Sequence, residues 1–124
     1  MLMNPRHYLL ISGTDTSAKA LVRAVMETND ELAVARDPLE AVGLMQNRQP
    51  DAVLWAMDAF DEESVVACRT LRRHSQAPIV LLVDSSAKED VLRGYRLGAD
   101  AHIAMPCDRR EFNARVKAVL RRSA

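Results

Sequence analysis

The chain has 124 residues, the size of one compact domain, so we expect a single domain over residues 1–124. Seventeen Lys and Arg residues balance seventeen Asp and Glu residues, and this zero formal charge argues against a dedicated nucleic-acid-binding domain. The hydrophobic share of 48% exceeds that of disordered chains, and no apolar run is long enough to span a membrane. The first residues also lack the apolar stretch of a signal peptide. We therefore expect a cytoplasmic protein whose two cysteines, Cys68 and Cys107, are free thiols.

Five short apolar runs predict five β-strands. The runs cover residues 8–11, 31–36, 52–57, 79–83 and 101–104. The first is apolar throughout, as is typical of a strand buried on both faces, and the third places the single tryptophan, Trp55, in the core. The second alternates polar and apolar residues, which favours a position at the edge of the sheet.

Segments with a helical period separate the strands and predict five helices. In the first, the residues with helical spacing are Leu21, Val22, Val25 and Met26. The second opens at Asp37-Pro38, a cap followed by proline, carries Leu39, Val42 and Met45, and ends before Pro50. The third covers residues 61–75, and its inward residues are Val65, Val66, Cys68 and Leu71.

The last two helices follow the fourth and fifth strands. The fourth begins at Ser85 or Ser86 and ends at Gly98, which suits a glycine cap. Asp108 caps the fifth. Its inward residues are Phe112, Val116, Val119 and Leu120. Alternating strands and helices joined by short loops predict an α/β fold with a parallel sheet covered on both faces.

Four local sequences in the correct order resemble the receiver domain of two-component response regulators. They are the Gly94–Asp100 segment (G-x-x-x-G-A-D in the family), Met105-Pro106 (Lys-Pro), Pro50–Leu54 (P-D-L-V-L) and the basic helix ending 115–122. The last of these is similar to the final receiver helix of OmpR-type regulators. The resemblance covers the whole chain and implies a doubly wound, flavodoxin-like (CheY-like) fold with five helices and strand order 2-1-3-4-5.

The resemblance also implies that the family's phosphorylation site is degenerate in this chain. The two acids that hold Mg²⁺ correspond to Ser12 and Gly13, the phosphoryl-accepting Asp to Ala56, the conserved hydroxyl residue to Val83, and the Lys to Met105. An aspartyl phosphate needs a carboxylate nucleophile, a metal held by oxygen ligands and a counter-charge. We therefore predict no catalytic residue, no metal and no cofactor, and an apolar plug of Ala56, Val83 and Met105 in place of the pocket.

Other polar residues near this site have simpler interpretations. Asp58 is the nearest acid, two positions after Ala56, and one carboxylate is too few ligands for a hard cation. Asp15 suits a helix cap. His102 replaces the mobile aromatic residue of the family, and we interpret it as a half-buried packing residue.

The basic final helix indicates a protein-binding face. In OmpR-type regulators the fourth helix, fifth strand and fifth helix form a two-fold dimer interface. The candidate interface residues are Asp100, His102, Glu111 and Arg115. We therefore predict a non-enzymatic, phosphorylation-independent receiver that signals by binding protein, as a homodimer or with another partner, without contacting nucleic acid or membrane. The last helix also favours a role as the regulatory half of a transcription regulator.

A second hypothesis comes from the hydroxyl-rich turn at Ser12–Ser17, between the first strand and a helix. Backbone amides and hydroxyls at such a turn can hold a phosphate group, as in flavodoxins. The alternative function is therefore a small anion- or flavin-binding protein. Flavin binding also requires aromatic residues beside the ring, and only Phe60 lies in a suitable loop.

Overall fold

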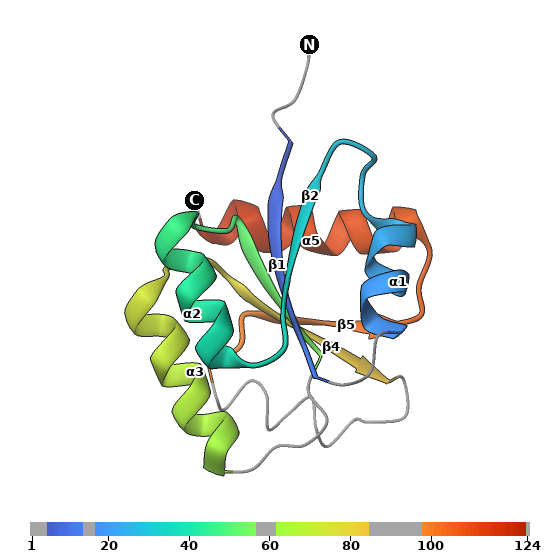
Figure 1. Cartoon of the computed structure of the whole chain (residues 1–124). Coiled ribbons are helices and arrows are strands. Elements are labelled where there is room, and N and C mark those ends of the chain that lie inside the picture. Colours follow the sequence, from blue (N-terminus) through green and yellow to red (C-terminus); the bar gives the residue numbers. More distant parts are fainter. Residues whose placement is uncertain (1–4, 14–16, 57–61, 85–97, 124) are drawn as a thin grey trace.

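In the computed structural model, which describes residues 5–13, 17–56, 62–84 and 98–123, five parallel strands form one sheet (Figure 1). The strands are β1 (His7–Ser12), β2 (Glu31–Ala35), β3 (Ala52–Ala56), β4 (Ile79–Asp84) and β5 (Ala101–Met105). Their spatial order is β2-β1-β3-β4-β5, with every neighbouring pair parallel. This order confirms the predicted topology, including the edge position of β2.

The helices cover both faces of the sheet. The described helices are α1 (Ser17–Val25), α2 (Pro38–Asn47), α3 (Glu62–His74) and α5 (Arg109–Ser123). Helices α2 and α3 pack against each other on one face, and α1 and α5 pack together on the other (Figure 1). The expected fourth helix falls on residues 85–97, which lie outside the described residues.

Strand alternation divides the buried apolar side chains between two cores. Leu10 and Leu54 belong to the core under α1 and α5, whereas their strand neighbours Leu9 and Val53 belong to the core under α2 and α3. In the first core the rings of Tyr8 and Phe112 meet edge to face at a centroid distance of 6.2 Å. Because each buried aliphatic or aromatic side chain contributes about 1.5–3 kcal/mol, these two cores stabilise the fold.

Local sequence signals predicted several features correctly. The Asp37 carboxylate accepts a hydrogen bond from the Glu40 N–H, and the Asp108 carboxylate accepts one from the Glu111 N–H, so both predicted caps are confirmed. Gly98 has φ +102°, the left-handed conformation for which glycine is suited. Trp55 is buried as expected. In the described part of the chain, no helix has the length and apolar character needed to cross a membrane.

One prediction about a helix face is wrong. Val66 was expected to point inward, but it is 62% exposed. Cys68 and Leu71, three residues apart, define the buried side of α3. Val66 lies two residues before Cys68, which is about 200° around the helix, so it must point to solvent.

Candidate functional site

The candidate site lies where the strands end, at the carboxyl edge of the sheet. Ser12, the last residue of β1, is in register with Ala56, the last residue of β3. Ser12 is buried, Ala56 is half-buried and Gly13 is exposed. The structure therefore brings together two of the predicted positions on adjacent strands. Neither of them supplies a carboxylate.

Met105 ends β5 at the same edge. It is in register with Asp84 on β4 and packs, half-buried, against the core under α1 and α5. The Cys107 thiol lies against it, with Sγ donating to Met105 Sδ at 3.6 Å. Burial raises the pKa of the Cys107 thiol, and the carboxylates of Glu111 and Asp108 raise it further. The thiol therefore stays protonated at neutral pH, and an uncharged sulfur pair lies at the position predicted to replace the family's lysine, Met105.

The sulfur contact and the position of Asp84 were both missed by the sequence analysis. A methionine and a cysteine two residues apart carry no distinctive signal, because only the path of the chain after β5 brings the two sulfurs into contact. Asp84 could have been noticed as the first acid after the apolar run of β4.

The apolar plug predicted for Ala56, Val83 and Met105 does not form as expected. Ala56 and Met105 pack against the core under α1 and α5, but Val83 packs against the core under α2 and α3. Val83 directly follows Leu82, which belongs to the first core, and successive strand residues point to opposite faces. The replaced positions therefore divide between the two sides of the sheet.

The predicted metal-site positions Ser12, Gly13 and Ala56 do not fit the magnesium ion of a receiver site. Mg²⁺ takes hard oxygen ligands, usually including one or two carboxylates. Ser12 offers one buried hydroxyl, while Gly13 and Ala56 offer no side-chain oxygen. Within the described ranges, no group of three or more His, Cys, Asp or Glu side chains is arranged to hold a metal.

The opposite, amino edge of the sheet is rich in charge. Three aspartates, each directly before a strand, accept a hydrogen bond from a backbone N–H at the start of a neighbouring strand. Asp30 accepts from the Arg6 N–H at 2.9 Å, Asp51 from the His7 N–H at 2.7 Å, and Asp100 from the Ile79 N–H at 2.7 Å. These carboxylates supply acceptors to backbone N–H groups that lie where the ladder of the sheet ends.

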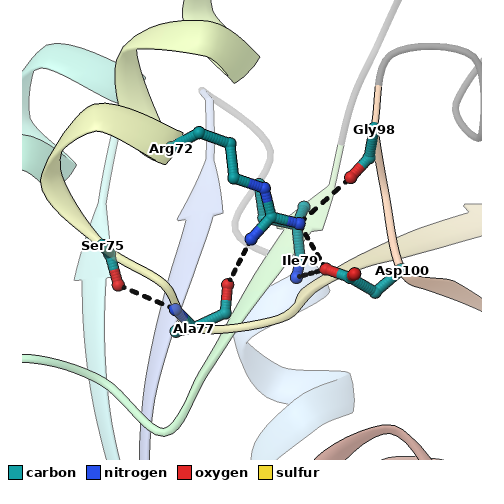
Figure 2. A network of polar contacts seen from close by, with 6 residues as sticks. All are labelled: Arg72, Ser75, Ala77, Ile79, Gly98 and Asp100. Atoms are coloured by element: carbon teal, nitrogen blue, oxygen red, sulfur yellow. Dashed lines mark hydrogen bonds and ion pairs between the residues drawn. The ribbon is translucent and has the colours of Figure 1, made fainter. Parts of the chain in front are cut away.

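Asp100 is also the centre of the network drawn in Figure 2. The guanidinium of Arg72, in the last turn of α3, forms an ion pair with its carboxylate. The same guanidinium donates to the carbonyl oxygens of Ala77 at 2.8 Å and Gly98 at 3.0 Å (Figure 2). The network therefore joins α3 to the starts of β4 and β5.

The predicted interface residues are placed in different surroundings. Asp100 is paired with Arg72, so its carboxylate already has a structural role. His102 lies half-buried on β5, as expected for a packing residue. Glu111 and Arg115 are exposed on α5 and form an ion pair at 3.3 Å within that helix. Glu111 and Arg115 therefore meet each other, while the ion partner of Asp100 comes from α3.

A doubly wound sheet in the order 2-1-3-4-5, with these two helical layers, defines the CheY-like class of flavodoxin fold. A protein-family model described as "Response regulator receiver domain" matches residues 9–117. The chain therefore belongs to the response regulator receiver family, which confirms the resemblance seen in the sequence.

Known proteins of this family share both sequence and fold with the chain. It is 31% identical over 114 residues to the transcriptional regulatory protein AfsQ1 of Streptomyces coelicolor, covering 92% of this chain and 51% of AfsQ1. The chain thus spans about half the length of this curated relative. Among solved structures, it is similar to the receiver domain of the response regulator TorR, with 26% identity, a TM-score of 0.75, and coverage of 97% of this chain and 100% of that one.

A third similar structure is the receiver domain of the sensor histidine kinase PA1611 from Pseudomonas aeruginosa. It has 19% identity, a TM-score of 0.70, and coverage of 94% of this chain and 98% of that one. That protein was crystallised with a magnesium ion coordinated in its active site cleft. At this identity, the comparison concerns the fold alone.

Proposed function

We propose that this protein is a phosphorylation-independent receiver: a non-enzymatic signalling domain that acts by binding protein. The observation that carries the proposal is Ala56. It ends β3 in register with Ser12 at the end of β1, the positions that correspond to the family's phosphoryl acceptor and one of its metal-binding acids. A methyl group cannot attack a phosphodonor, and no acyl phosphate can form on it.

The surroundings of Ala56 support the same proposal. A receiver needs a dication and a lysine to neutralise the incoming phosphoryl group, and here Gly13 and Met105 stand at two of those positions. The PA1611 receiver, with the same fold, holds magnesium in its cleft, whereas the donor set in this chain does not suit that ion. Input to the domain would then come from protein contacts rather than from phosphate.

Receiver domains work through protein partners, and similarity to a transcriptional regulator favours a role in transcription control. We propose that the partner surface includes β5 and α5, that this domain itself does not contact DNA, and that it acts in the cytoplasm. Two kinds of partner could bind this surface: a second copy of the chain or a different protein. The alternative of a flavin- or anion-binding protein receives no support, because the chain is a receiver and residues 14–16 of its proposed turn lie outside the described residues.

Beryllofluoride, which mimics a bound phosphoryl group, tests the proposal. Amide spectra of the ¹⁵N-labelled protein should be the same with Mg²⁺ alone and with Mg²⁺ plus beryllofluoride. The control variant restores an acid at each of Ser12, Gly13 and Ala56 and a lysine at Met105, and its spectrum should change. Shifts in the wild-type protein that cluster around Ala56 would contradict the proposal.

A further inference from the structure

The outward face of α5 carries a stripe of exposed residues that the receiver fold itself does not need. Arg110, Ala114, Lys117 and Arg121 are all exposed and follow one another at intervals of four, three and four residues. Such spacing puts them on one side of the helix over about three turns. Phe112, on the opposite side of α5, is fully buried. The four residues of the stripe therefore do not contribute to the hydrophobic core.

The charge of this helix is strongly one-sided. Helix α5 holds six basic side chains and one acidic one, Glu111, and Glu111 is already paired with Arg115. Helix α1, which packs beside α5, adds Lys19 and Arg23 and no acid. Within the described ranges, the basic side chains of these two helices other than Arg115 form no ion pair. The whole chain is neutral, so this layer concentrates positive charge.

A second copy of the chain is a poor occupant for this face. A two-fold contact places the same surface on both subunits, so the cations of one stripe would meet the cations of the other. Glu111 and Asp100, the acids expected to balance them, are held by Arg115 and Arg72 of the same chain. Like charges that face each other across an interface repel, so they lower the affinity for such a partner.

The shape of the face fits another helix. Ala114 is exposed and Ala118 is half-buried one turn later, so two methyl groups lie among the basic side chains of the outward surface. Small side chains let two helices approach closely at these positions, while the longer basic side chains around them reach the partner.

We propose that the α5 stripe of Arg110, Ala114, Lys117 and Arg121 binds an acidic helical segment of a different protein. The inference rests on the proposed function, because it assumes that the domain acts by protein contact. Acidic side chains along the partner helix would pair with the unpaired cations, and its backbone would lie over Ala114 and Ala118.

Nucleic acid suits the face less well. A nucleic acid carries charge along its whole length, and the acids of this neutral chain would repel it beyond the basic layer. Single strands also need aromatic platforms for stacking. The described aromatic residues Tyr8, Trp55 and Phe112 are all buried. A compact acidic helix matches the patch without extending past it.

The test uses a fluorescein-labelled, stapled helical peptide rich in Glu and Ala, with glutamates along one face. Binding is measured by fluorescence anisotropy at low salt and at 0.3 M salt, where screening of the exposed charge pairs should weaken it. The double variant Lys117→Glu with Arg121→Glu should bind at least about tenfold more weakly. The matched control is Arg69→Glu with Arg73→Glu, which makes the same charge change at two exposed positions of α3, four residues apart. This control should bind the peptide like the wild type.

Two further arms decide between the alternatives. Ala114→Gln adds bulk without charge and should weaken binding several-fold, whereas unchanged binding would show that no helix lies over this residue. Absence of peptide binding by the wild type, equal loss in both charge-reversed variants, or tighter binding of duplex DNA would each overturn the proposal. Self-association in sedimentation runs that Lys117→Glu abolishes would do the same in favour of a second copy. None of these results depends on whether the domain takes up phosphate.

Discussion

The two edges of the sheet have opposite characters. At the amino edge, three carboxylates accept hydrogen bonds from backbone N–H groups at or next to the start of a neighbouring strand: those of Asp30, Asp51 and Asp100. The Asp100 carboxylate also forms an ion pair with Arg72. At the carboxyl edge, Ala56 ends β3 beside Ser12, and we propose that it occupies the position of the family's phosphoryl acceptor. If the proposed function is correct, the comparison teaches that the receiver fold does not depend on the receiver chemistry. The interactions that stabilise the sheet lie in its two cores and at its amino edge, so the carboxyl edge is free to change.

The largest effect should follow from breaking the amino edge at Asp100. Asp100→Ala leaves the Ile79 N–H without an acceptor and the Arg72 guanidinium without its ion partner. Because hydrogen bonds to charged groups contribute about 1.5–3 kcal/mol and this site is partly exposed, we expect a loss of about 2 kcal/mol in the free energy of unfolding. Urea titration followed by circular dichroism measures it. Glu111→Ala removes an equally charged but exposed carboxylate and should cost less than about 0.5 kcal/mol.

A double-mutant cycle sharpens this prediction. Arg72→Ala should cost about 1 kcal/mol, and Asp100→Ala with Arg72→Ala should cost less than the two single changes together, because both remove the same ion pair. Strict additivity would mean that the network in Figure 2 does not couple α3 to the strands.

A smaller effect should follow from pH at the same edge. Burial, and next the nearby Arg48 guanidinium, lower the pKa of His7 from its ordinary value of 6.5, against the opposing effect of Glu31 and Asp51. The unfolded chain then binds the proton more readily than the folded one, so folding stability falls as the pH is lowered below about 6.5. His7→Gln should reduce this fall, whereas His74→Gln, at an exposed position on α3, should not. A wild-type protein that gains stability between pH 7 and 5.5 relative to His7→Gln would contradict the sign.

At the carboxyl edge, we expect Mg²⁺ to have no effect on the stability of the protein. A ligand that binds the native state raises its stability by RT ln(1 + [L]/Kd), so even a millimolar site would raise the melting temperature at tens of millimolar Mg²⁺. We expect no shift beyond that of a NaCl control of equal ionic strength. A saturable, Mg²⁺-specific rise that Asp84→Asn abolishes would show that the acid ending β4 rebuilds a metal site.

The sequence predicted the fold because the relevant signals are local. Apolar runs such as the one that forms β4, and caps such as Asp37, depend on neighbouring residues, so the elements followed from them, whereas strand order and family followed from the resemblance of short motifs to receiver domains. Val66 was misplaced because an apolar residue was counted without its angle around α3. The partner of Asp100 was missed because Arg72 lies 28 positions away, a separation that only the tertiary fold closes.

The candidate site was predictable in identity and less so in geometry. The replaced positions were predicted from short motifs and remain a prediction, and the structure places two of them, Ser12 and Ala56, in register. The separation of Val83 from Ala56 and Met105 was not foreseen, because it depends on which face of β4 each residue occupies. The fourth helix remains a prediction, since residues 85–97 lie outside the described residues.

The central claim, that the carboxyl edge cannot accept a phosphoryl group, is tested most directly by intact-mass spectrometry after incubation with acetyl phosphate and Mg²⁺. The wild-type mass should stay unchanged, and Ala56→Asp alone should also stay unmodified, because Ser12, Gly13 and Met105 would still supply neither metal ligands nor a counter-charge. A stable gain of one phosphoryl group in the wild type, lost on changing Asp58 or Asp84, would contradict the account.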